Sequence, residues 1–76
     1  MMPGTTIYRY DTDHDVMYVQ LEKYTPDESV HYVDDEILPD INEVRDVRNE
    51  DLVGFVILDY RRNKPKLVKR YPEYFF

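Results

Sequence analysis

The pattern of apolar and polar positions is most distinctive between residues 51 and 60. Two apolar residues, Gly54 and a run of four further apolar residues (55–58) follow one another there. The run is short and rich in β-branched and aromatic side chains, which predicts a strand rather than a helix. Because side chains alternate across a strand, four consecutive apolar residues place apolar groups on both faces, as in a central strand of a covered sheet. Gly54 predicts a bulge or a close backbone approach within this strand.

Two segments near the N-terminus alternate between apolar and polar positions. Residues 5–10 and 16–22 predict strands, and the polar turn between them (11–15) predicts that they join as a β-hairpin. In the first strand, alternation places Tyr8 and Tyr10 on one face.

Two further segments carry weaker strand patterns. Residues 30–33 predict a short edge strand, which we expect the three adjacent acids at 34–36 to interrupt. Residues 37–44 alternate in part, and Pro39 cannot donate a ladder hydrogen bond, so an edge or bulged strand is predicted. A helix over 43–51 would have only two apolar residues on its face and fits the pattern less well.

The C-terminal segment changes from strand to helix patterning. We expect residues 61–65 to end the sheet and Pro65 to open a short helix that stops before Pro72. Leu67, Val68 and Tyr71 would form its apolar stripe. The whole pattern predicts an α+β fold: a small antiparallel sheet of four or five strands with a short C-terminal helix or an irregular tail.

Length and composition set further limits. The 76 residues predict a single domain (1–76), with residues 1–4 frayed. The chain has no cysteine, hence no disulfide or thiolate zinc site, and no apolar run approaches the roughly 18 residues that span a membrane. The N-terminus lacks the pattern of a secretory signal. These features predict a cytoplasmic protein, and so small a core favours self-association or a partner.

Charge is distributed unevenly along the chain. Residues 1–60 carry fifteen acids and four bases, whereas residues 61–76 carry one acid and six bases, so the net charges are −11 and +5. An acidic body does not favour nucleic acid, because phosphate contacts need positive charge. It would attract a basic partner.

Two segments resemble a known family. Tyr10–Val19 reads Tyr-Asp-Thr-Asp-His-Asp-Val-Met-Tyr-Val, and Val53–Asp59 reads Val-Gly-Phe-Val-Ile-Leu-Asp. Both are similar to the pattern of small prokaryotic proteins catalogued as domain of unknown function 2283, over roughly residues 6–60; residues 34–51 are longer and more charged than that pattern, and 61–76 lie outside it. The resemblance implies a small β-sheet domain with a C-terminal helical piece and no established enzymatic activity. Because some members sit beside small toxin-like proteins, it also implies an antitoxin-like role.

The predicted hairpin turn contains the spacing of a calcium loop. Asp11, Asp13, Asp15 and Glu22 match positions 1, 3, 5 and 12 of such a loop. However, Val16 stands where the sharp turn requires glycine, and a strand over 16–22 would carry Glu22 about 20 Å away. The pattern therefore favours an acidic turn whose Asp side chains accept local backbone hydrogen bonds, with weak incidental cation binding as the alternative.

The sequence predicts no catalytic residue, cofactor or metal site, and hence a non-enzymatic protein. His14 and His31 have no partner at a helical spacing, and Ser29 follows two acids without the glycine of a nucleophile elbow. The two glycines, Gly4 and Gly54, form no phosphate-binding loop.

The basic and aromatic tail (61–76) is the remaining candidate site. Aromatic side chains and arginine anchor protein interfaces, and bases with aromatic rings also bind nucleic acid. Three interpretations remain open: packing on the chain's own acidic sheet, an interface with a partner or a second copy, and, least favoured, nucleic-acid binding. The predicted partner-binding residues are Arg61, Arg62, Lys69, Arg70, Tyr71, Tyr74, Phe75 and Phe76.

Two functional hypotheses follow from these observations. In the first, a small cytosolic protein-binding domain, antitoxin-like, docks a basic partner on its acidic body. In the second, the chain is a self-assembling structural module, a homodimer joined through strand edges or through the aromatic tail.

Overall fold

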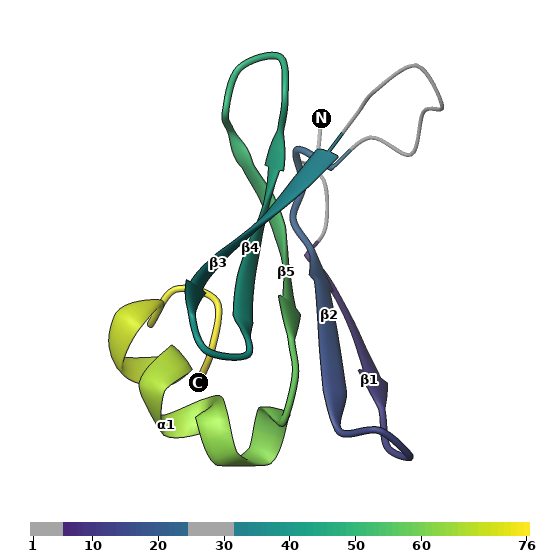
Figure 1. Ribbon diagram of the computed structural model, residues 1–76. Coiled ribbons are helices and arrows are strands. Elements are labelled where there is room, and N and C mark those ends of the chain that lie inside the picture. The colour runs from purple at the N-terminus through teal and green to yellow at the C-terminus, as the bar shows by residue number, and fades with distance from the viewer. Residues whose placement is uncertain (1–5, 25–31) are drawn as a thin grey trace.

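The computed structural model describes residues 6–24 and 32–76 (Figure 1). Five strands and one helix form in the described part: β1 (Ile7–Asp11), β2 (Val16–Gln20), β3 (Tyr32–Leu38), β4 (Ile41–Asp46), β5 (Leu52–Ile57) and α1 (Tyr60–Arg70). All five strands join one antiparallel sheet in the order β1-β2-β5-β4-β3. The predicted α+β fold class is confirmed.

The apolar run at 51–60 becomes β5, which lies at the centre of the sheet as predicted. Its residues Val53, Phe55 and Ile57 are at most 1% exposed. β5 pairs with β2 on one side and with β4 on the other. The strand with the strongest apolar pattern thus holds the N-terminal hairpin and the β3–β4 hairpin together.

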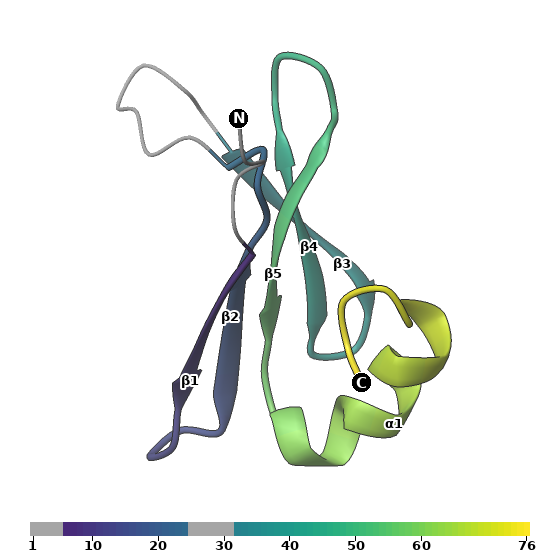
Figure 2. The same ribbon diagram turned by 180° about the vertical axis from the view of Figure 1, so that it is seen from behind.

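The two faces of the sheet differ in what covers them. Helix α1 and the segment after it pack against one face, here called the helix face, beside β3, β4 and β5 (Figures 1 and 2). The opposite side, here called the open face, is not covered by the helix. The core lies between the helix face of the sheet and the C-terminal segment. The sheet side contributes Met17, Val19, Leu21, Ile41, Phe55 and Ile57, and the C-terminal segment contributes Leu67, Tyr71 and Phe75.

Aromatic rings fasten the C-terminal segment to the core. The ring centre of Phe55 lies 4.8 Å from that of Tyr71 and 5.2 Å from that of Phe75, both in edge-to-face contact. The Tyr8 hydroxyl donates to the backbone carbonyl of Tyr74 at 2.5 Å, which ties β1 to the same segment. Edge-to-face pairs of this kind add to the stabilisation from burial alone.

Gly54 shows both features that the sequence suggested. The pairing of β4 with β5 shifts register between Val44↔Gly54 and Arg45↔Leu52, which is a β-bulge. A Cβ atom built on Gly54 would lie well inside van der Waals distance of the carbonyl oxygen of Val19. Glycine lets the backbones of β5 and β2 approach this closely.

Acidic residues make the tight turns of this chain. The described non-glycine residues with positive φ are Asp15, Asp40, Glu50 and Asp59, with φ between 50° and 69°. Each stands between two elements, where glycine or asparagine is common. Aspartate tolerates this backbone conformation because its short side chain hydrogen-bonds locally. Part of the negative charge of residues 1–60 therefore comes from acidic residues that occupy turns.

The predicted start of the helix at Pro65 is wrong, as is the end of the sheet at 61–65. Helix α1 begins at Tyr60 and contains Pro65 in its interior, at the cost of one intrahelical hydrogen bond. Asp15, in the turn after β1, caps the first turn of the helix and so allows it to begin early. The Asp15 backbone carbonyl accepts from the Tyr60 N–H at 2.9 Å, and the Asp15 carboxylate oxygens accept from the Arg61 backbone N–H at 3.3 Å. The described part contains no helix long and apolar enough to cross a membrane.

The middle strands also differ from prediction. The acids at 34–36 do not interrupt a strand, because β3 runs through them to Leu38. Residues 37–44 do not form one strand either: Pro39 and Asp40 make the turn between β3 and β4. The alternative helix at 43–51 is wrong, because β4 extends to Asp46. Exposed edge positions tolerate charge, and this tolerance allows three adjacent acids in β3.

Several predictions lie outside the described residues. These are the frayed N-terminus (1–4) and the start of the edge strand predicted at 30–33. Ser29 and His31 also lie outside the described residues.

Candidate functional site

Three adjacent carboxylates lie on the outermost strand β3. Asp34, Asp35 and Glu36 are all exposed, and β3 pairs with β4 alone among the described strands. Pairing opposite Val44 and Asn42 places Asp34 and Glu36 on the open face, whereas Asp35 lies on the helix face. None of the three carboxylates forms an ion pair with a described residue. β3 thus presents a negative strand edge whose charge is not neutralised within residues 6–24 and 32–76.

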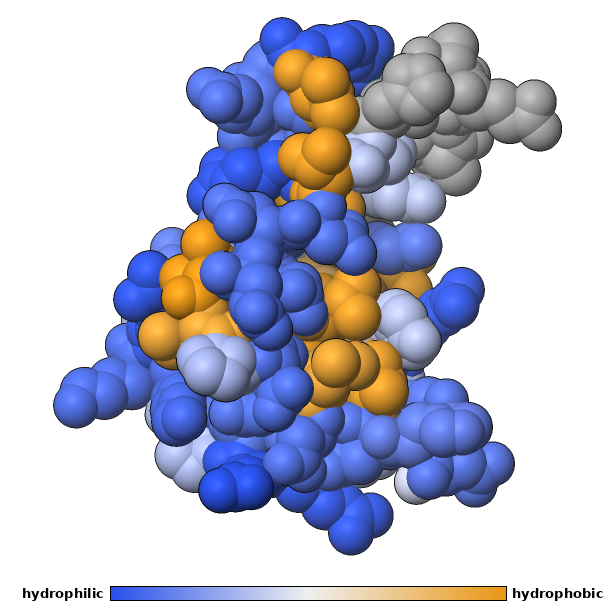
Figure 3. Space-filling model, viewed as in Figure 1, coloured by the Kyte–Doolittle hydropathy of each residue, from blue (hydrophilic) through white to orange (hydrophobic). Residues whose placement is uncertain are grey.

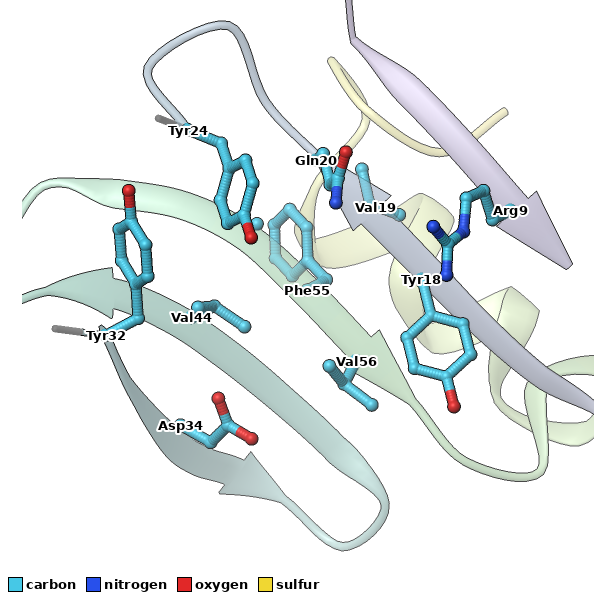
Figure 4. A pocket seen from close by; sticks show the side chains of 11 residues that line it. Arg9, Tyr18, Val19, Gln20, Tyr24, Tyr32, Asp34, Val44, Phe55 and Val56 are labelled. Carbon is cyan, nitrogen blue, oxygen red and sulfur yellow. The ribbon is translucent and has the colours of Figure 1, made fainter. Parts of the chain in front are cut away.

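A hollow of about 240 Å³ lies beside this edge, on the open face (Figure 4). In the figure, α1 lies behind the sheet, on the far side from the hollow. Tyrosine rings, small apolar side chains and one charged residue at each side surround it. The lining residues are Arg9, Tyr18, Val19, Gln20, Tyr24, Tyr32, Asp34, Val44, Gly54, Phe55 and Val56.

Aromatic contacts organise both ends of the hollow. Towards β3, the rings of Tyr24 and Tyr32 stack with centres 5.0 Å apart and planes at 23°. Towards β1, the Arg9 guanidinium carbon lies 5.9 Å from the ring centre of Tyr18. The hollow therefore has a negative end at Asp34 and a positive end at Arg9.

The basic residues of the predicted tail site are exposed on α1. Arg61, Arg62, Lys69 and Arg70 all have exposed side chains. Arg61 Nε donates to the hydroxyl of Tyr10 at 3.2 Å, and the Arg62 guanidinium lies 3.8 Å from Asp59. These contacts are at the surface, where ion pairs contribute little to stability. The basic side of α1 thus remains accessible.

The aromatic residues of the predicted tail site do not lie together on the surface. Tyr71 and Phe75 are buried in the chain's own core, at 8% and 2% exposure, and Tyr74 is half-buried. Phe76 is 86% exposed. In this fold, Phe76 and the bases of α1 remain accessible to a partner, whereas Tyr71 and Phe75 do not.

A buried carboxylate connects β4 to the end of α1. Glu43 is 6% exposed, and its Oε1 accepts from Arg45 at 2.6 Å and 3.2 Å. Its Oε2 accepts from the Tyr71 hydroxyl, which in turn accepts from Arg70 Nε at 3.2 Å. Burial, together with the hydrogen bond to Glu43, raises the pKa of Tyr71. Since all its members have partners, this network is structural.

The turn after β1 forms the local hydrogen bonds expected of an acidic turn. The Asp11 carboxylate accepts from the backbone N–H of Asp13 at 3.0 Å and from that of His14 at 3.3 Å. It also lies 2.9 Å from His14 Nδ1, and this hydrogen bond, aided by those from the backbone, lowers the pKa of Asp11. The Asp15 carboxylate instead accepts from the Tyr10 hydroxyl. Within residues 6–24 and 32–76, no three His, Asp or Glu side chains are grouped to hold a metal ion.

The tyrosines of the hollow could not be recognised as site residues from the sequence. Tyr18, Tyr24 and Tyr32 come from β2, the segment after it and β3, which the sheet order places on different sides of β5. Their only signal in the sequence is the high tyrosine count, 8 of 76 residues. Pairing of β5 between β2 and β4 is what brings them to one face.

In comparisons with known proteins, neither a family model, nor a curated protein, nor a solved structure matches the chain. The resemblance to domain of unknown function 2283 therefore remains a hypothesis.

Proposed function

We propose that this chain is a small, non-enzymatic protein-binding domain that docks a basic segment of a partner on its acidic body, along β3. The observation that carries the proposal is the row of three exposed carboxylates, Asp34 to Glu36, on an outermost strand. A strand edge offers backbone N–H and C=O groups to an added strand. Carboxylates beside that edge select a segment that carries arginine or lysine.

The surface composition supports recognition by charge. On the face that Figure 3 shows, the orange patches of apolar side chains are interrupted by hydrophilic residues. Obligate interfaces are instead large and apolar. The same carboxylates oppose pairing of two copies through β3, because antiparallel self-pairing would bring acids opposite acids. A basic partner is therefore the better occupant of this edge.

The family resemblance supports an antitoxin-like form of this function. In that form, the partner is a small basic toxin-like protein in the cytoplasm. This part of the proposal rests on analogy with the family.

The test of the proposal uses acetylated hexa-arginine as a stand-in for the basic segment. Replacing the three carboxylates together (Asp34→Asn, Asp35→Asn, Glu36→Gln) should weaken its binding roughly tenfold, because each exposed charge contributes up to about 1 kcal/mol. Binding by the unmodified chain should weaken as salt increases. Isothermal titration calorimetry over a salt series measures both effects.

A matched variant distinguishes the effect of the β3 carboxylates on binding from the effect of the total charge of the chain. Asp13→Asn, Glu22→Gln and Glu73→Gln together remove the same charge from exposed positions elsewhere. We expect this variant to lose no more than about twofold in affinity, as for distant screened charges. Equal losses in the two triple variants, affinity independent of salt, or preferential binding of hexa-glutamate would each contradict docking on β3.

Self-association through β1 is the second candidate function. β1 is the other outermost strand, and its side chains Ile7 and Tyr8 are 48% and 42% exposed. It carries one base and one acid, Arg9 and Asp11, and a two-fold axis at Tyr10 would place Arg9 of one copy opposite Asp11 of the other. A second copy added at this edge would continue the sheet across a two-fold axis.

The oligomeric state tests this second candidate. If two copies pair through β1, light scattering should detect a dimer, and Ile7→Lys should raise its dissociation constant at least roughly tenfold, because lysine on an edge strand opposes pairing. Phe76→Ser, at the exposed end of the aromatic tail, should leave the dimer unchanged. A monomer at all concentrations would exclude self-association, and loss of the dimer in Phe76→Ser alone would assign the interface to the tail. Removing residues 71–76 is not a suitable variant, because Tyr71 and Phe75 are core residues.

A further inference from the structure

We infer that the hollow on the open face receives an arginine side chain of the docked segment, at its β3 end. The inference rests on the proposed function and deepens it, because it names the chemical group that the domain would recognise beside its acidic edge.

The β3 end of the hollow combines ring faces with a carboxylate. Tyr24 and Tyr32 stack at 5.0 Å, and Asp34 follows Tyr32 by two residues in β3, so their side chains share the open face. Figure 4 shows the two rings and the Asp34 carboxylate on the same side of the hollow. A guanidinium group is planar and stays charged, so it stacks on an aromatic face while its N–H groups bind a carboxylate.

The same face already holds one contact of this kind. Arg9 places its guanidinium carbon 5.9 Å from the ring centre of Tyr18, at the β1 end. A second cation close to Arg9 would be repelled, whereas Asp34 attracts one at the opposite end. The charges of the hollow therefore assign an incoming cation to the β3 end and orient the segment that carries it.

The floor of the hollow favours a long, partly apolar side chain. Val44 and Val56 are half-buried, and Gly54 between them contributes no side chain. The methylene stem of arginine covers such a floor while its charged group reaches the rim. An apolar floor also lowers screening by water and so strengthens the contact between the guanidinium and Asp34.

The test compares two neighbouring carboxylates that point to opposite faces. Asp34→Asn should weaken binding of acetylated hexa-arginine roughly fivefold, whereas Asp35→Asn, with the same change in charge on the helix face, should weaken it by less than about twofold. Both side chains are exposed, so both variants should keep the fold. Titrations followed by NMR measure the affinity and also report whether the signals of the hollow shift.

Further probes identify the group that is recognised. Hexa-citrulline, which is uncharged but has the shape of hexa-arginine, should not bind measurably. Tyr24→Leu should weaken hexa-arginine binding about threefold and hexa-lysine binding less, because arginine stacks on aromatic rings better than lysine does. Arg9→Gln should raise the affinity, because it removes a positive charge from the hollow.

The outcomes separate this inference from the proposed function. Equal losses in Asp34→Asn and Asp35→Asn, with binding still dependent on the three β3 carboxylates, would overturn the inference and leave the proposed function standing. Equal binding of hexa-citrulline, or signal shifts confined to the helix face, would also overturn it. If the unmodified chain does not bind hexa-arginine at low salt, both fail together.

Discussion

Gly54→Ala is expected to lower the free energy of unfolding by about 3 kcal/mol, the upper end of the usual cost of overpacking. The added methyl group would lie well inside van der Waals distance of the Val19 carbonyl oxygen, a backbone atom of the adjacent strand that cannot rotate away. Strand propensity alone predicts the opposite sign, since glycine inside a strand costs about 0.5 to 1 kcal/mol relative to alanine. The sign of the change therefore decides whether the backbone contact or the propensity dominates. Urea unfolding followed by circular dichroism measures it.

An exposed position on α1 supplies the control for this prediction. Lys66→Ala should change the free energy of unfolding by no more than about 0.5 kcal/mol, as expected of a surface substitution. A Gly54→Ala variant within 1 kcal/mol of the parent chain would show that β2 and β5 separate at little cost, and the close backbone approach at Gly54 would then be a weak constraint.

The second large effect is expected at Glu43. Glu43→Ala should cost about 2 to 3 kcal/mol, because it leaves the Tyr71 hydroxyl and the Arg45 guanidinium without their buried acceptor. Breaking a fully buried pair can cost more, but the Arg45 side chain is 36% exposed and regains water. Thermal or urea unfolding measures the loss.

Tyr71→Phe is the matched variant. It removes the hydrogen bond between the Tyr71 hydroxyl and Glu43, and it leaves Glu43 paired with Arg45. We expect it to cost about 1 kcal/mol, less than Glu43→Ala.

Tyr71→Phe should also change how stability responds to alkali. Because the pKa of Tyr71 is raised in the folded chain above 10.0, its contribution to stability is complete below pH 10 and is lost as pH rises beyond that value. Tyr71→Phe should therefore show a shallower loss of stability above pH 10; an unchanged slope would contradict burial of the hydroxyl.

Much of the fold could be predicted because local patterns and final contacts agree. The apolar run around Phe55 predicted a central strand, and the alternation of Tyr8 and Tyr10 predicted that they share a face. That face is the helix face, where they pair with Val19 and Met17. The helix boundaries could not be predicted in the same way. Asp59 stands at the N-cap position but its side chain forms no cap, and the group that caps residues 60 and 61 instead, Asp15, lies 46 residues away from Arg61.

Only the negative charge of the candidate site could be predicted from the sequence. The acidic body was evident from the sequence, but the position of Asp34 on an outermost strand depends on the order β5-β4-β3. The stacking of Tyr24 on Tyr32 likewise depends on the return of the chain from one half of the sheet to the other. Tail residues such as Phe75 and Phe76 look alike in the sequence, yet one is buried and the other exposed. Composition thus suggested a basic partner, whereas the position of the proposed docking edge depends on strand order.

The cap of α1 has a consequence for how the chain folds. The helix has no acidic residue in its first turn, no side-chain cap from Asp59 and a proline in its interior, so as an isolated segment it would be too weak to persist. Its first N–H groups acquire their acceptors only when Asp15 arrives with the β1–β2 hairpin. That hairpin is in turn held against β5 by a pairing between residues such as Val19 and Phe55, far apart in the chain. We therefore expect this long loop to close before the helix gains its start, so that α1 forms among the last elements and the rate of folding depends on the sheet.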